Sequence, residues 1–178
     1  MGHSTGAEHG LPTRALSAYL ERELGRRFPI HEVRRLTAGA SNQMYVLGTD
    51  EGDVVLRVPP QVKTSKTAHD IGREYRMLRA LDGTAVPHPR PVHLCTDPAP
   101  LGRPFMLVEH VPGFHLDLPL DSPYELGPAR LRELAEAFID NLAIIASVDW
   151  RAAGLEGFGR PEGFLERQVD RWLSQLAE

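Results

Sequence analysis

Cysteine is nearly absent from this sequence, with Cys95 the only one among 178 residues. A single cysteine cannot form a disulfide or a cysteine-based zinc site within one chain. Cys95 lies in an apolar run, which favours a small buried hydrophobic side chain over a reactive thiol. The lack of a disulfide framework fits a reducing, cytoplasmic location, which we expect by default.

Long apolar runs and an excess of positive charge are also missing. No segment has the roughly 18 consecutive apolar residues that a membrane helix needs, and the first residues lack the apolar core of a secretory signal. The 20 basic and 24 acidic residues give a formal net charge of −4. This balance argues against binding nucleic acid through phosphate contacts. We therefore expect neither a membrane nor a nucleic-acid partner.

Several motifs of nucleotide-binding proteins and hydrolases do not occur. There is no Walker A loop, because no Gly-Lys-Ser or Gly-Lys-Thr is present, and there is no His-Glu-x-x-His pair. His110 and His115 flank a Pro-Gly turn without clear carboxylate partners. Structural or surface roles are therefore favoured for both histidines over a metal site.

What the sequence does contain is a set of short strands with helical segments around and after them. The turns between the first strands are too short for helical crossovers, so an antiparallel meander is expected. The predicted strands are Val33–Leu36, Met44–Leu47, Val54–Val58, Val92–Thr96 and Phe105–Glu109. Helical spacing of apolar residues predicts helices at Thr13–Leu24, about Ala68–Leu81, from Pro128 through Ile145, and Leu165–Leu176. The fold class is therefore α+β.

A break in this pattern at Val111-Pro112-Gly113 is typical of a hinge between two lobes. We predict a flexible N-terminus at residues 1–10, which are polar and rich in Gly and His. Residues 11–110 form the predicted sheet-containing lobe. Residues 111–178 form the hinge and part of a helical second lobe.

Three features in the first lobe could carry chemistry. The small, polar turn Thr37–Asn42 lies between two strands, so its backbone N–H groups could face an anion, with the Ser41 hydroxyl as a further donor. Arg57 closes a strand, and Glu74 lies in the helix that follows. Alone, each is more simply a hairpin turn, a surface cation or a surface carboxylate. It is harder to obtain by chance all four features in this order: the turn, the cation on a strand, the carboxylate on a helix and the hinge.

At these residues the sequence resembles the aminoglycoside phosphotransferase-like kinases (the APH/choline kinase type). The similarity is to the branch of kinase-like domains found with acyl-CoA dehydrogenases, and it covers about residues 30–178. The residues that carry it are Leu36–Asn42, Val55–Pro60, Ala68–Asp70, Arg73–Arg76, Val86–Pro91, Val148–Trp150, Phe158–Pro161 and Glu166–Gln168. The resemblance implies a protein-kinase-like first lobe, a hinge and an incomplete helical second lobe.

The resemblance also implies roles for individual residues. The turn containing Gly39 and Ser41 would cover the phosphates of ATP. Arg57 would replace the usual phosphate-binding lysine, which keeps the charge but changes the geometry, and Glu74 would orient it. The Glu109 carbonyl and the Val111 N–H would pair with adenine. The implied reaction is ATP-dependent phosphoryl transfer to a hydroxyl of an unknown small molecule.

The sequence departs from the family after the hinge. The family's HGD-type catalytic aspartate, its downstream asparagine and its magnesium-binding aspartate have no counterparts here, and Asp149 lies too early to replace them. Magnesium is expected for the family, but its ligands are not in this sequence. We therefore expect this chain to supply the nucleotide-binding lobe and to have little or no activity alone. The alternatives are a non-catalytic, pseudokinase-like binding or scaffold module, and one half of a split kinase.

The apolar stripe from Leu131 to Ile145 bears on these alternatives. In a complete kinase fold such a helix is covered by later elements, whereas here only Leu165–Leu176 is available to cover it. We therefore expect an exposed apolar surface, and with it self-association, a complementing chain or low stability.

Overall fold

The computed structural model of the protein describes residues 10–36, 43–60, 70–113, 127–160 and 162–176. The predicted turn with Gly39 and Ser41, His115 and nearly all of the predicted loose N-terminus lie outside these ranges. The described elements are α1 (Thr13–Leu24), β1 (Glu32–Leu36), β2 (Gln43–Thr49), β3 (Gly52–Val58), α2 (Ile71–Leu81), β4 (Pro91–Cys95), β5 (Phe105–Glu109), α3 (Pro128–Ala146) and α4 (Phe164–Leu176).

The five strands form one antiparallel sheet with the order β1-β2-β3-β5-β4. This arrangement confirms the predicted α+β class. Strands β1, β2 and β3 form the expected antiparallel meander, whereas β5 lies between β3 and β4. The turn between β2 and β3 is shorter than predicted, because Thr49 already pairs with Gly52. Gly52 has a φ of 110°, a conformation that residues with a Cβ rarely adopt, which explains glycine at the tight turn.

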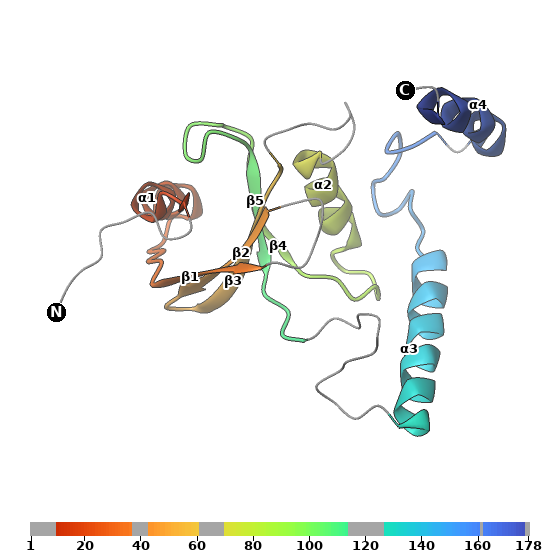
Figure 1. Ribbon diagram of the computed structural model, residues 1–178, viewed down its shortest axis with the longest axis horizontal. Coiled ribbons are helices and arrows are strands. Elements are labelled where there is room, and N and C mark those ends of the chain that lie inside the picture. The colour runs from red at the N-terminus through yellow and green to blue at the C-terminus, as the bar shows by residue number, and fades with distance from the viewer. Residues whose placement is uncertain (1–9, 37–42, 61–69, 114–126, 161, 177–178) are drawn as a thin grey trace.

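The sheet is covered by α1 on one face and by α2 on the other (Figure 1). Because side chains alternate along a strand, Leu56 and Val58 of β3 face α1, whereas Val55 faces α2. The α1 side holds the larger cluster of buried residues, which contains Leu11, Leu16, Leu20, Phe28, Val33, Tyr45, Leu47, Leu56, Val58, Cys95, Phe105 and Leu107. The buried residues of the α2 side are Ile71, Met106 and Val108.

Cys95 is buried in the cluster beneath α1, with 1% of its surface exposed. Its Sγ lies 3.1 Å from the Asp97 carbonyl oxygen, to which the thiol donates a hydrogen bond. This confirms the interpretation of Cys95 as a small buried hydrophobic residue.

Helix α1 is joined to the sheet by an aromatic cluster. The Tyr19 ring packs edge-on against Phe105 and His93, with ring centroids 5.8 and 5.7 Å away. The Tyr19 hydroxyl lies 3.2 Å from Nε2 of His93 on β4. Gly25 ends the helix with a φ of 64°, as its place in the sequence predicts.

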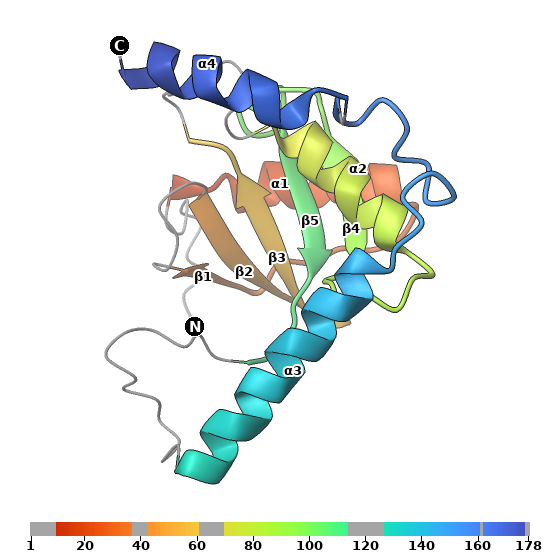
Figure 2. The same cartoon turned by 90° about the vertical axis from the view of Figure 1, so that its right-hand side faces the viewer.

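Helices α3 and α4 lie beyond α2, and α4 does not cover α3 (Figures 1 and 2). Pro128 occupies the first turn of α3, as predicted. The expected exposed apolar surface is present, with Phe138 of α3 64% exposed and Trp172 of α4 61% exposed. Neither helix contains a buried residue.

Within the described ranges, no helix combines the length and apolarity that crossing a bilayer requires.

The contact between α1 and β4 predicts a pH dependence of stability. Burial lowers the pKa of His93 below its ordinary value of 6.5, with the charge of Glu23 opposing the shift. The folded protein therefore binds a proton at His93 less readily than the unfolded chain. This contribution to stability is complete above pH 6.5 and is lost as the pH falls through 6.5 towards the lower folded pKa.

Replacing His93 by glutamine should remove this contribution and keep a polar group near Tyr19. We expect the wild type to lose more unfolding free energy than H93Q between about pH 8 and about pH 5. The difference should stay below about 1 kcal/mol, because the side chain is only partly buried. Urea unfolding across this pH range measures it, and parallel pH profiles for the two proteins would contradict the expectation.

Candidate functional site

Arg57 lies near the end of β3, on the face of the sheet that α2 covers. It is two residues after Val55 and therefore shares the orientation of that residue. In the sheet it stands between Met44 of β2 and Met106 of β5. The strand thus directs a cation towards the helix rather than into solvent.

Glu74 lies in the first turn of α2 and faces this cation. The helix begins after Asp70, whose carboxylate accepts a hydrogen bond from the Arg73 N–H at 3.0 Å. The buried Ile71 fixes the start of the helix on the sheet. A carboxylate in the first turn is also favoured by the positive end of the helix dipole.

Arg57 and Glu74 form an ion pair, with Nη2 of the arginine 2.9 Å from Oε2 of the glutamate. The two side chains are 29% and 32% exposed. At this depth the pair is less screened by water and salt than a surface pair. The structure thus brings together the strand cation and the helix carboxylate that the sequence predicts to interact.

The guanidinium of Arg57 has binding capacity beyond Glu74. Its Nε is buried and has no hydrogen-bond acceptor among the described residues. A buried donor without an acceptor is costly, and an arginine offers five N–H donors in a planar fork. The Arg57 side chain is still 29% exposed, so its positive charge fits a further anionic group such as a phosphate.

Glu109 ends β5, and the predicted hinge follows it. In the sheet, Glu109 pairs with Val54 and Met106 pairs with Arg57. The hinge end and the cation are therefore three residues, or about 10 Å, apart along the same strand pair. Val111 is exposed, and within the described ranges no hydrogen bond from its N–H is present.

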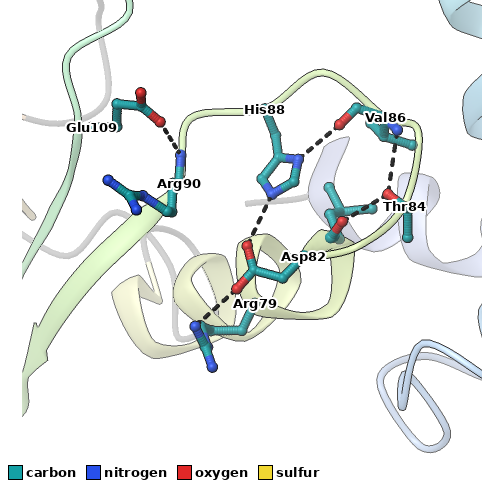
Figure 3. Close-up of polar contacts among 8 residues, drawn as sticks. Arg79, Asp82, Thr84, Val86, His88, Arg90 and Glu109 are labelled. Atoms are coloured by element: carbon teal, nitrogen blue, oxygen red, sulfur yellow. Dashed lines mark hydrogen bonds and ion pairs between the residues drawn. The ribbon is translucent and has the colours of Figure 1, made fainter.

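The end of β5 is tied to the segment that precedes β4 (Figure 3). The Glu109 N–H donates to the Arg90 carbonyl at 2.8 Å, and the Glu109 carboxylate accepts from the Arg90 N–H at 3.2 Å. In the same segment, Nδ1 of His88 lies 2.8 Å from the Val86 carbonyl oxygen. Nε2 of His88 lies 3.5 Å from the carboxylate of Asp82, which follows α2, so the segment is anchored to the end of that helix. These contacts fix the position of the hinge end relative to α2.

The role of one residue near the site was not predicted from the sequence. Arg103, in the turn before β5, donates to the Pro59 carbonyl at 3.0 Å and to the Gln43 side chain at 2.7 Å. It thereby joins the start of β2 to the segment after β3, next to the predicted phosphate turn. Its partners are 44 and 60 residues away in the chain, so no local pattern could have indicated this role. The turn itself, with Gly39 and Ser41, lies outside the described residues.

Comparison with known proteins agrees with this arrangement. The model of the phosphotransferase enzyme family matches residues 32–178. Mouse acyl-CoA dehydrogenase family member 10 is 35% identical over 167 residues, or 93% of this chain. Chicken acyl-CoA dehydrogenase family member 11 is 36% identical over 144 residues, or 80% of this chain. A solved structure described as an aminoglycoside phosphotransferase, from Ralstonia eutropha, is 31% identical and matches 92% of this chain with a TM-score of 0.74.

The sheet and its flanking helices thus have the kinase-like fold of aminoglycoside phosphotransferases. The chain belongs to the phosphotransferase enzyme family, which confirms the resemblance stated from the sequence. It spans 15% of the mouse protein, 18% of the chicken protein and 46% of the Ralstonia chain.

The ion pair predicts a measurable coupling between the two elements that it joins. R57M and E74Q should each destabilise the protein by about 1 kcal/mol, and the double variant by less than the sum. The exposed pair Arg130–Glu133 on α3, with a 2.6 Å contact, is a matched control. Its coupling should be below about 0.5 kcal/mol and should weaken more in high salt. Urea unfolding of both double-mutant cycles tests this, and equal coupling energies in the two pairs would contradict it.

Proposed function

We propose that this chain supplies the nucleotide-binding lobe of an ATP-dependent phosphotransferase that acts on a small-molecule hydroxyl. The observation that carries the proposal is the ion pair between Arg57 and Glu74, which spans β3 and α2 at 2.9 Å in a chain of the phosphotransferase family. Arg57 binds a phosphate of ATP, and Glu74 holds the guanidinium in place. When bound, ATP supplies the phosphoryl group.

The donor chemistry of Arg57 supports this role. One side of the guanidinium contacts Glu74, while the buried Nε has no acceptor among the described residues. Hydrogen bonds between charged groups are shorter and stronger than neutral ones, so a phosphate oxygen is a well-matched acceptor. Gly39 and Ser41, in the segment predicted from the sequence to be a turn, complete the phosphate site in this proposal.

The hinge end is proposed to bind adenine. The Glu109 carbonyl accepts from the base and the Val111 N–H donates to it. The exposure of Val111 and the fixed position of Glu109 beside Arg90 are consistent with this assignment. Residues 11–110 then form the nucleotide-side lobe, and residues 111–178 form the hinge and the helical part of the second lobe.

A non-catalytic binding or scaffold module is the second candidate. It is favoured by the exposed apolar residues of α3 and α4, a surface that suits association. We therefore propose that the chain on its own binds nucleotide without appreciable turnover, and that it acts in phosphoryl transfer only together with further polypeptide.

Nucleotide binding separates the nucleotide-binding lobe from a scaffold that binds no nucleotide. Isothermal titration calorimetry with magnesium and ATP should show one site on the wild-type chain. R57A should weaken binding about 10- to 100-fold, the value of a hydrogen bond between charged groups. R57K should retain more affinity, because it keeps the charge.

The matched control is R35A, which removes an exposed arginine from β1 and leaves β3 intact. Affinity should be unchanged in this variant. Equal affinity in R57A and the wild type would refute the phosphate-binding role of Arg57. The absence of any wild-type binding would favour the scaffold.

The apolar surface of α3 predicts association of the isolated chain. Phe138, Leu142 and Ile145 are spaced to lie along one side of the helix, and all three are exposed. Analytical ultracentrifugation should show a sedimentation coefficient that rises with protein concentration. The double variant F138K/L142Q should reduce this rise, whereas E136Q on the same helix should not. A wild-type chain that stays monomeric at every concentration would contradict the association.

A further inference from the structure

Phe158 joins the segment between α3 and α4 to the helix that carries Glu74. The Arg73 Nη1 donates a hydrogen bond to the Phe158 carbonyl oxygen at 2.7 Å. The guanidinium carbon of the same arginine lies 3.8 Å from the centre of the Phe158 ring. Arg76, one turn further along α2, lies 5.4 Å from the ring centre. The ring is thus placed against two cations on one side of the helix.

The burial pattern distinguishes Phe158 from the other described phenylalanines of the second lobe. Phe138 and Phe164 are exposed, whereas Phe158 is half-buried. Its contacts are with α2, which Figure 2 shows beside the chain segment that links α3 to α4. Phe158 is therefore a point at which the second lobe is fastened to the sheet-containing lobe.

The position of this contact on α2 matters for the ion pair. Arg73 immediately precedes Glu74, and both lie in the first turn of the helix. Successive helical residues point about 100° apart, so the helix can direct Glu74 to the sheet and Arg73 to Phe158 at the same level. The first turn is thus held from two sides, by the sheet through Ile71 and Glu74 and by the second lobe through Arg73.

We propose that Phe158 and Arg73 are positioning residues that fix the first turn of α2 and thereby hold Glu74 against Arg57. The segment around Phe158 then sets the affinity of the phosphate-binding arginine without touching the nucleotide. Arg76 supports the ring from the next turn. The effect on nucleotide affinity rests on the proposed function, whereas the effect on the first turn of α2 does not.

Amide hydrogen exchange tests the structural part. F158A should speed exchange in residues 71–77 about two- to tenfold, because the first turn opens more often. F158Y, which keeps the ring face, should exchange like the wild type, and so should F138A, which removes an exposed phenylalanine from α3. If F158A unfolds the chain, R73Q replaces it, because Arg73 is an exposed side chain. Unchanged exchange in residues 71–77 would overturn the proposal.

A double-mutant cycle on nucleotide affinity tests whether the contact acts through Glu74. In calorimetry with magnesium and ATP, F158A should lower affinity about two- to tenfold in the wild-type background. It should have no further effect in the E74Q background. R132Q, which removes an exposed arginine from α3, should leave affinity unchanged.

An equal loss from F158A in both backgrounds would show that Phe158 acts independently of Glu74 and would overturn the proposal. If the wild type binds no nucleotide, the proposed function fails. The exchange measurement alone then tests whether Phe158 holds the first turn of α2.

Discussion

The ion pair between Arg57 and Glu74 is the interaction on which the site depends. It places a cation on the face of the sheet that α2 covers, next to the apolar contacts of Ile71, Met106 and Val108. A partly buried arginine without a carboxylate partner would be costly there, and so would the carboxylate alone. The ion pair therefore fixes both the position of α2 on the sheet and the orientation of the arginine side chain. The contact between Arg73 and Phe158 also joins the segment between α3 and α4 to this helix.

Local patterns in the sequence predicted much of this fold. The helical spacing of apolar residues predicted α1, and the short apolar runs separated by turn residues predicted the strands, because these signals act over a few residues. The pairing of Arg57 with Glu74 followed from the order of the motifs and the resemblance that they support. Contacts between distant residues were not predictable in this way. Arg103 and Phe158 reach partners 44 to 85 residues away, and single side chains carry no local signal of such contacts.

The two parts of the chain differ in how they are stabilised. The sheet, α1 and α2 enclose two clusters of buried residues, whereas α3 and α4 contain no buried residue. The apolar stripe of α3 was predictable from its periodicity, but periodicity shows only that a face is apolar and not what covers it. A sheet with its own core beside helices with an exposed apolar surface is consistent with the proposal that the chain works with further polypeptide.

The central claim is that Arg57 contacts the phosphates of ATP. The most direct measurement is the ¹H–¹⁵N NMR signal of the Arg57 Nε–H during titration with magnesium and ATP, assigned by comparison with R57K. Our account predicts that this signal shifts on binding while the signal of Arg35 stays in place. A nucleotide that binds without moving the Arg57 signal would contradict the account.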